Sequence, residues 1–322
     1  MSLMIDNPNY SDIKIICGDA VSFNACSAIL AARSETFSQI LCNYDVINIK
    51  NRELHFRMIS GEIMRFILEF IYTGKLNGET ERYESDVEEE DDEEEYDFLN
   101  VDNVFELYIA ADYFQMVKLQ EIIVDYLKKV CKHEGENIAP ELLTSAVKHM
   151  RHILDDDTTI PSSPSLSKHT DNEMKTLLLD TVSRISLDKI KFGRLSLNAL
   201  EYLLKYTYPR RKYLNILEYL VLRYALLLSA RSVSKDAFIS LENRLPISNN
   251  IKRERPRILD RNDTLATFSS VRNSISDIVT PLLEYIAFRK IDGNILKDLI
   301  EPLGIIKKRY HVGSLSIPRN RI

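Results

Sequence analysis

The spacing of apolar residues changes near position 25, and this change constrains the fold more than any other feature of the sequence. Residues 10–23 alternate between apolar and polar on either side of a turn at residues 17–19. The alternating apolar residues are Ile13, Ile15, Val21 and Phe23. Alternation predicts a β-hairpin, whereas the three- and four-residue spacing that follows predicts helices. A hairpin of this size is unstable alone, so helices must cover it and we expect an α+β fold.

Capping residues divide the rest of the first third into short elements. Residues 27–32 predict a short helix, Ser34 is placed to cap the next helix, and residues 46–49 predict a third strand. Ser60 is placed to cap a longer amphipathic helix. Gly74 would end that helix in a left-handed conformation.

The remainder of the chain has helical periodicity. Asp102 is placed to cap one helix, and an apolar stripe over residues 119–130 predicts another. Further helices are predicted at residues 141–154, 177–185, 197–204, 215–231, 236–245, 274–288 and 294–300. Residues 155–173 contain prolines among serines and predict a loop. Successive short helices favour an all-α second half built from helical hairpins.

Charge is distributed unevenly along the 322 residues, although the net charge is only −6. Residues 79–97 hold thirteen acidic residues and one basic residue, Arg82, and so carry −12. Residues 251–322 hold fourteen basic and eight acidic residues, which gives +6. Because the acidic run lacks apolar periodicity, we expect a disordered insertion at residues 79–100. The two segments could attract each other, bind separate partners, or both be solvated surface.

Signals for enzymatic chemistry are weak. The nine glycines are scattered and form no phosphate-binding loop. His149 and His152 lie near the aspartates at residues 155–157, but no third His or Cys completes a zinc site. The basic residues 252–257 include no aromatic side chain for base stacking, which favours a loop over a nucleic-acid patch. We therefore expect no enzyme activity, catalytic residue, cofactor, metal, small-molecule substrate or nucleic-acid partner.

The first residues and the cysteines indicate an intracellular setting, cytoplasmic or nuclear. Residues 1–12 have neither the basic nor the apolar part of a signal peptide. The most apolar stretch, residues 214–230, carries Glu218 and Arg223 and is too short to span a membrane. The four cysteines show no CxxC spacing, so we expect them to be reduced.

Three separated motifs in the first 130 residues carry a family resemblance. They are YSDIKIICGDAVSFNACSAILAARSETFSQIL, IMRFILEFIYTGKL and VFELYIAADYFQMVKLQEIIVDYL. In this order they resemble a BTB/POZ domain, a small three-stranded sheet packed by helices. The motif positions are Asp12, Cys26, Arg33, Tyr72 and Gly74. The phrases around residues 32–37 and 67–74 also resemble the large fungal set of BTB proteins.

Three later segments more weakly resemble the BACK region that follows many BTB domains. They are LSLNALEYLL, LEYLVLRYALLLSA and LLEYIAFRKIDGNILKDLIEPLGII. The two resemblances imply an N-terminal tail at residues 1–9 and a BTB/POZ domain at residues 10–132. They also imply a BACK-like helical domain at residues 137–312 and a C-terminal tail at residues 313–322.

The resemblance implies a non-catalytic protein-interaction adaptor. Many family members recruit substrates to the cullin-three RING ubiquitin ligase, while others oligomerise and contact no ligase. Kelch-like adaptors carry a recognition domain after BACK, and this chain ends soon after Ile306. Either its helical surface binds the target, or a C-terminal domain lies outside the chain.

The family's docking surface implies a set of partner-binding residues in this chain. They are Leu41, Cys42, Asn43, Tyr44 and Tyr113. Cullin-binding members often have an acid where this chain has Asn43, which departs from the pattern. A second departure is Ser27, which occupies the position of the charged companion of Asp12. Arg33 is the substitute partner that we consider for Asp12.

Overall fold

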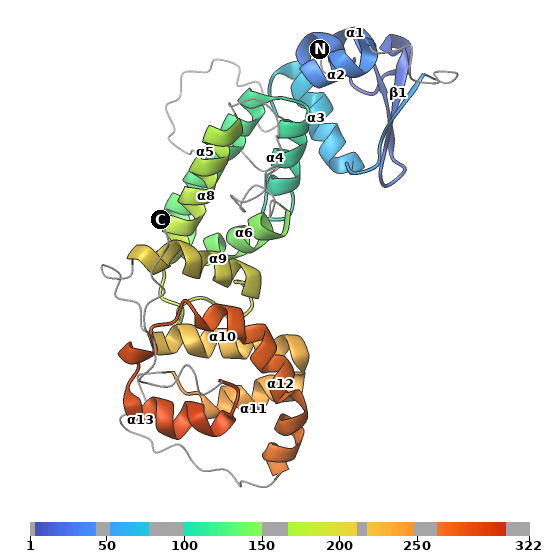
Figure 1. Cartoon of the computed structure of the whole chain (residues 1–322). Coiled ribbons are helices and arrows are strands. Elements are labelled where there is room, and N and C mark those ends of the chain that lie inside the picture. The colour runs from blue at the N-terminus through green and yellow to red at the C-terminus, as the bar shows by residue number, and fades with distance from the viewer. Residues whose placement is uncertain are drawn as a thin grey trace, which may run out of the picture. The chain divides into compact units, whose positions relative to one another are not determined.

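The computed structural model describes residues 4–42, 52–76, 99–149, 167–210, 218–247 and 263–306 (Figure 1). The chain divides into two compact units. The N-terminal unit comprises Met1–Ile138 and Ser145–Leu178, and the C-terminal unit comprises Ala139–Thr144 and Leu179–Ile322. The predicted acidic insertion and C-terminal tail lie largely outside the described residues.

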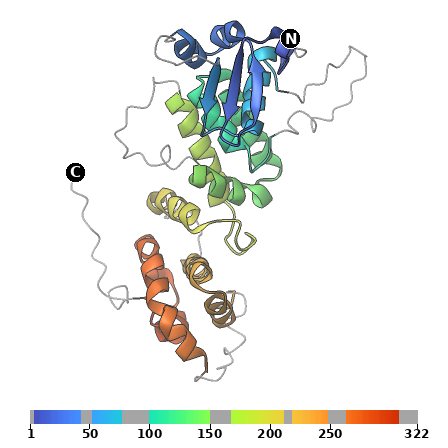
Figure 2. The ribbon, with the colours of Figure 1, turned by 90° about the vertical axis from the view of Figure 1, so that its right-hand side faces the viewer.

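A three-stranded sheet opens the N-terminal unit, as the alternation at residues 13–25 predicts. Strands β1 (Ile13–Cys17) and β2 (Ser22–Ala25) pair antiparallel, with Ile15 opposite Phe23. Strand β3 (Glu53–Phe56) pairs parallel to β1, which gives the order β2-β1-β3. Figure 2 shows the three strands side by side in front of helices of the same unit.

The position of the third strand differs from the sequence prediction. Residues 46–49, where we predicted it, lie outside the described residues. The strand that completes the sheet is Glu53–Phe56. In this strand only Leu54 and Phe56 are buried apolar residues, so its alternation is too short to stand out in the sequence.

Three helices follow or separate these strands, and Ser34, Ser60 and Gly74 lie at the helix ends where the sequence predicts caps. Helix α1 (Ser27–Arg33) is followed by α2 (Glu35–Cys42), where the Oγ of Ser34 accepts a hydrogen bond from the N–H of Phe37 at 3.3 Å. Helix α3 (Gly61–Thr73) begins after Ser60 and ends at Gly74, whose φ of 74° is left-handed. These caps confirm the sequence predictions.

Four longer helices complete the N-terminal unit. They are α4 (Val104–Tyr113), α5 (Val117–His133), α6 (Gly135–His149) and α8 (Ser167–Ser183). Helices α6 and α8 also contribute residues to the C-terminal unit. A 3₁₀ turn (Pro8–Tyr10) precedes β1. The buried aromatic side chains of this unit include Phe37, Tyr72, Phe105, Tyr108 and Phe114.

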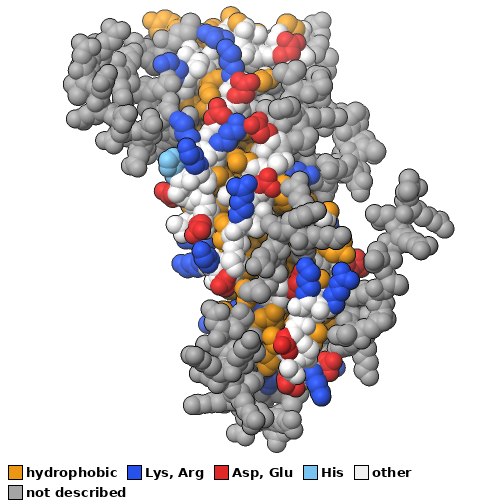
Figure 3. Space-filling view, turned by 90° about the vertical axis from the view of Figure 1, so that its left-hand side faces the viewer, with side chains coloured by type: hydrophobic (Ala, Val, Ile, Leu, Met, Phe, Trp, Pro, Cys, Tyr) orange, Lys and Arg blue, Asp and Glu red, His pale blue; other side chains and the backbone are white. Residues whose placement is uncertain are grey.

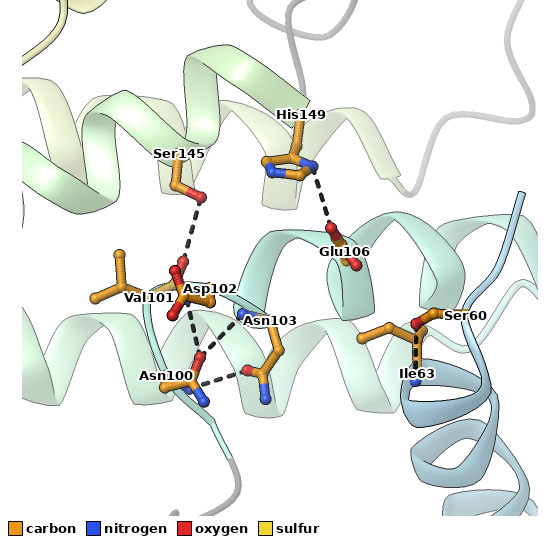
Figure 4. Close-up of polar contacts among 9 residues, drawn as sticks. All are labelled: Ser60, Ile63, Asn100, Val101, Asp102, Asn103, Glu106, Ser145 and His149. Atoms are coloured by element: carbon orange, nitrogen blue, oxygen red, sulfur yellow. Dashed lines mark hydrogen bonds and ion pairs between the residues drawn. The ribbon is translucent and has the colours of Figure 1, made fainter. Parts of the chain in front are cut away.

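The prediction that Asp102 caps α4 is wrong. The N-cap is Asn103, and the side chain of Asn100 accepts hydrogen bonds from the N–H groups of Asp102 and Asn103 at 2.9 and 3.0 Å (Figure 4). The Asn100 side chain thus orders the turn that precedes α4, and the side chain of Asn103 makes no capping hydrogen bond to the helix.

The regular secondary structure of the C-terminal unit is all helical among its described residues. Its main helices are α9 (Leu197–Thr207), α10 (Glu218–Val233), α11 (Lys235–Arg244) and α12 (Asp263–Leu283). Short turns follow at Tyr208–Arg210, Phe288–Lys290, Gly293–Ile295, Leu296–Ile300 and Glu301–Leu303. Helix α10 packs against α9, α11 and α12 and buries nearly all of its residues, as its apolar sequence predicts.

Several helix boundaries differ from the sequence predictions. Helix α6 begins at Gly135 rather than near residue 141, and Pro140 lies inside it. Helix α8 begins at Ser167, so the last residues of the predicted loop at 155–173 are helical. Helix α12 begins at Asp263, ahead of the predicted residue 274. Proline and serine residues weaken the helical signal locally, while neighbouring helices supply the stabilising contacts.

Candidate functional site

The carboxyl end of α4 joins the amino end of α2 through two side-chain hydrogen bonds. The hydroxyl of Ser34 donates to the carbonyl of Phe114 at 2.8 Å, and the hydroxyl of Thr36 donates to the carbonyl of Tyr113 at 2.7 Å. These carbonyls belong to the end of a helix, where backbone acceptors lack partners within the helix. The two hydroxyls therefore fix the place at which α4 ends.

Aromatic rings fill the junction beneath these hydrogen bonds. Phe37 stacks on Phe114 with ring centroids 4.6 Å apart and an interplanar angle of 8°. The ring of Phe56 meets both at their edges, at 5.6 and 5.4 Å. Tyr113 lies at the border of this cluster, with its ring 6.3 Å from Phe56 and 51% of its surface exposed. The cluster thus supports one large aromatic side chain at the surface.

A groove of about 640 Å³ lies beside Tyr113, between the loop after β3 and helix α4. Phe56, Ile63 and Ala110 are buried residues in its lining. Met58 and Tyr113 also line it, and 97% of Met58 is exposed. A side chain this exposed buries almost no apolar area within the fold and remains accessible to a partner.

Charged and titratable groups border the same groove. The Nδ1 of His149, from α6, lies 3.8 Å from the Oε1 of Glu106, from α4 (Figure 4). Arg57 and His55 line the groove from the loop after β3 and from the strand itself. The groove therefore combines an apolar lining with polar groups of both signs, the composition typical of a protein-binding site.

The turn between β1 and β2 holds the Met58 loop in place. The N–H of Gly18 donates to the carbonyl of Ile59 at 2.9 Å, and a Cβ on Gly18 would lie 2.2 Å from the carbonyl oxygen of Arg57. The carboxylate of Asp19 accepts a hydrogen bond from the N–H of Gly61 at 2.9 Å. This hydrogen bond lowers the pKa of Asp19 below its ordinary 3.8, despite the opposing effect of burial.

Asp12, which matches the family's acidic position, and Ser27, which departs from the family pattern, meet in the structure. The N–H and the hydroxyl of Ser27 both donate to the Asp12 carboxylate, at 2.7 and 2.5 Å. Burial raises the pKa of Asp12, but the Ser27 hydrogen bonds and the charge of Arg52 together hold it below 3.8. The expected partner, Arg33, is exposed at the end of α1 and is not among the groups that act on Asp12. Arg52 lines the same cavity as Asp12 and Ser27.

Three other family motif positions, Cys26, Tyr72 and Gly74, stabilise the fold. The N–H of Cys26 donates to the hydroxyl oxygen of Tyr72 at 2.8 Å, which ties the start of α1 to α3. Gly74 ends α3 in the left-handed conformation. Burial, together with the charge of Asp19, raises the pKa of Cys17 to about 11, so its thiol is inert at neutral pH.

The structure describes three of the five expected partner-binding residues, Leu41, Cys42 and Tyr113. Leu41 lines a separate cavity of about 310 Å³ with Asp12, Ser27 and Arg52, whereas Tyr113 lines the larger groove. Thr36, which contacts Tyr113, and Leu41 differ by five positions, roughly 140° around the helix. Cys42 is exposed at the end of α2. Asn43 and Tyr44 lie outside the described residues.

Sequence reasoning missed Met58 and Arg57. Both lie in the turn between β3 and α3, where the sequence offers no periodicity and no motif that would distinguish a presented side chain from a solvated one. Only the exposure of Met58 beside the buried residues of the groove reveals it.

Figure 3 shows one face of the molecule, on which the described Lys and Arg side chains are interspersed with Asp and Glu. Among the described residues, no group of three or more His, Cys, Asp or Glu side chains could hold a metal ion. His152 and residues 155–157, considered as ligands with His149, lie outside them.

Comparison with known families supports the assignment of the N-terminal unit. A sequence model described as the BTB/POZ domain matches residues 3–130. Residues 3–130 are a BTB/POZ domain. BTB/POZ domains are generally non-catalytic modules that mediate protein–protein contacts and oligomerisation, and the groove beside Tyr113 belongs to this one. No curated protein matches the chain.

No helix in the described part of the chain combines the length and apolar character that crossing a membrane requires.

Proposed function

We propose that the chain is a non-catalytic adaptor whose BTB/POZ domain docks a protein partner at the groove beside Tyr113. The observation that carries this proposal is the pair of exposed apolar side chains, Met58 and Tyr113, that line one groove of mixed polarity. Backbone hydrogen bonds hold the Met58 loop, and the Thr36 hydroxyl holds the carbonyl of Tyr113, which limits the ordering that docking requires.

The partner that we propose is the cullin-three scaffold of a RING ubiquitin ligase. Aromatic anchors commonly dominate protein interfaces, and Tyr113 is both exposed and supported by buried rings. The helices of the C-terminal unit, for which we propose a BACK-like arrangement within residues 137–312, would then present the target. The substitution of Asn43 for the usual acid argues for weak binding.

The alternative is an oligomerisation or scaffold protein that contacts no ligase. This role is equally compatible with a BTB/POZ domain, because such domains also self-associate.

Calorimetric titration of the whole chain with the purified N-terminal region of cullin-three tests the two roles. Dissociation constants of micromolar or lower would support the ligase adaptor. Absent binding, together with a stable dimer in light scattering, would overturn it in favour of oligomerisation. Asn43→Glu, which restores the family's acid, should strengthen binding, and Asn43→Gln is the matched control.

A further inference from the structure

The hydroxyls of Ser34 and Thr36 both donate hydrogen bonds to carbonyls at the carboxyl end of helix α4, but each holds a different residue. Ser34 is 3% exposed, and its hydroxyl both accepts from the N–H of Phe37 and donates to the carbonyl of Phe114. It therefore joins two buried rings and the start of α2. Thr36 is half-buried, and its hydroxyl donates to the carbonyl of Tyr113 itself.

Among the described residues, Tyr113 has few other restraints. It is the last residue of α4, and Gln115, two residues later, has a left-handed φ of 56°. Its ring makes edge contacts with Phe56 and Phe114, at 6.3 and 5.0 Å, and half of its surface is exposed. A helix end with so little side-chain packing frays unless its carbonyls are held.

We propose that Thr36 is a positioning residue that sets the direction in which Tyr113 is presented to a partner. The hydrogen bond to the Tyr113 carbonyl holds the last peptide unit of α4, and the Cα–Cβ direction of Tyr113 follows from that backbone. Ser34, in contrast, stabilises the buried junction. This inference rests on the proposed docking role of Tyr113.

Binding measurements separate the two hydroxyls. Thr36→Val removes the donor but keeps the shape, and should weaken binding of the purified cullin-three N-terminal region by roughly three- to tenfold, the loss of one hydrogen bond. Thr36→Ser should restore binding. Ser34→Ala should lower the melting temperature more than Thr36→Val does. In the Tyr113→Ala background, Thr36→Val should cause no further loss of binding.

A spectroscopic measurement decides the inference without any partner. With 3-fluorotyrosine placed at position 113 of the whole chain, the ¹⁹F spectrum should show one sharp resonance. Thr36→Val should shift or broaden it, and Thr36→Ser should not. An unchanged resonance in Thr36→Val would overturn the inference whether or not cullin-three binds. A changed resonance with no cullin-three binding would instead reject the proposed partner and leave the positioning role of Thr36 standing.

Discussion

The BTB/POZ domain and helix α10 of the C-terminal unit use apolar residues in opposite ways. The domain leaves Met58 and Tyr113 exposed at a loop and at a helix end, whereas α10 buries all but a few of its sixteen residues. Even the carboxylate of Glu218 in α10 is 3% exposed and accepts a hydrogen bond from the N–H of Ala287. Exposure of large apolar side chains is thus concentrated where the chain turns.

The contrast has a physical cause. A helix surrounded by other helices gains stability from every apolar residue, so its sequence is apolar on all sides. A loop gains little from burial, and its backbone needs hydrogen bonds from neighbouring elements. Gly18 and Asp19 supply these for the Met58 loop, and Thr36 supplies one for Tyr113. Met58 and Tyr113 are therefore exposed side chains on backbone that hydrogen bonds from neighbouring elements hold in place, which is what a binding surface needs.

The strongest test of the rigid support is Phe37→Ala. Phe37 is fully buried and stacks on Phe114, so its loss should reduce the free energy of unfolding by about 3–5 kcal/mol. Chemical denaturation followed by circular dichroism measures this change. Tyr208→Ala, at a half-exposed ring in the C-terminal unit, is the control. A loss below about 1 kcal/mol would show that the aromatic junction does not support the domain.

Leu226→Ala tests whether the C-terminal unit is scaffold alone. Leu226 is fully buried in α10, and the cavity should cost about 2–5 kcal/mol of unfolding free energy. Partner binding measured well below the melting temperature should stay within twofold of the parent. If binding falls as far as stability does, the distinction between a docking domain and a helical scaffold fails.

Tyr113→Ala should produce the reverse pattern. Truncating an exposed aromatic anchor should weaken binding of cullin-three by about 2 kcal/mol, or more than tenfold, with little change in stability. Calorimetric titration gives the affinity and thermal denaturation gives the stability. Ile239→Ala, at another partly exposed apolar residue on α11, should leave binding unchanged. Equal effects of the two variants would place the docking surface elsewhere.

Acidification should weaken the sheet end of the BTB/POZ domain. Asp12 and Asp19 have folded-state pKa values below the ordinary 3.8, so their contribution to stability is complete above that pH and is lost as the pH falls below it. The denaturation midpoint should drop less between pH 6 and pH 3 in Asp12→Asn and Asp19→Asn than in the parent. Glu242→Gln controls for the loss of one charge. Parallel pH profiles in all variants would contradict this assignment.

The smallest effect is expected from removing residues 83–96 and bridging them with a short Gly/Ser linker. Like charges repel when the chain compacts, and this segment offers almost no apolar area to bury. The melting temperature should stay the same or rise slightly. A loss of cooperative unfolding would instead show that this segment is a structural element packed against the rest of the chain.

Helices and strands with a strong apolar periodicity could be predicted from the sequence. Strands and helix boundaries that depend on packing against neighbouring elements could not. The hairpin, α3 with its caps and the buried α10 follow directly from apolar spacing. Strand β3, the cap at Asn103 and the early starts of α6, α8 and α12 depend on contacts from other elements. Local propensity is weak beside tertiary packing, so boundaries are the first features to be misplaced.

The sequence by itself determined that a small sheet must be packed by helices, and that the first 130 residues carry the BTB/POZ pattern. Apolar periodicity is a local property, so one chain suffices to read it. Only the tertiary structure decided that Arg52 lines one cavity with Asp12, and that Met58 joins Tyr113 at one groove. These pairs lie tens of residues apart, and their proximity follows from how β1, β3, α1 and α4 pack, which no local pattern encodes.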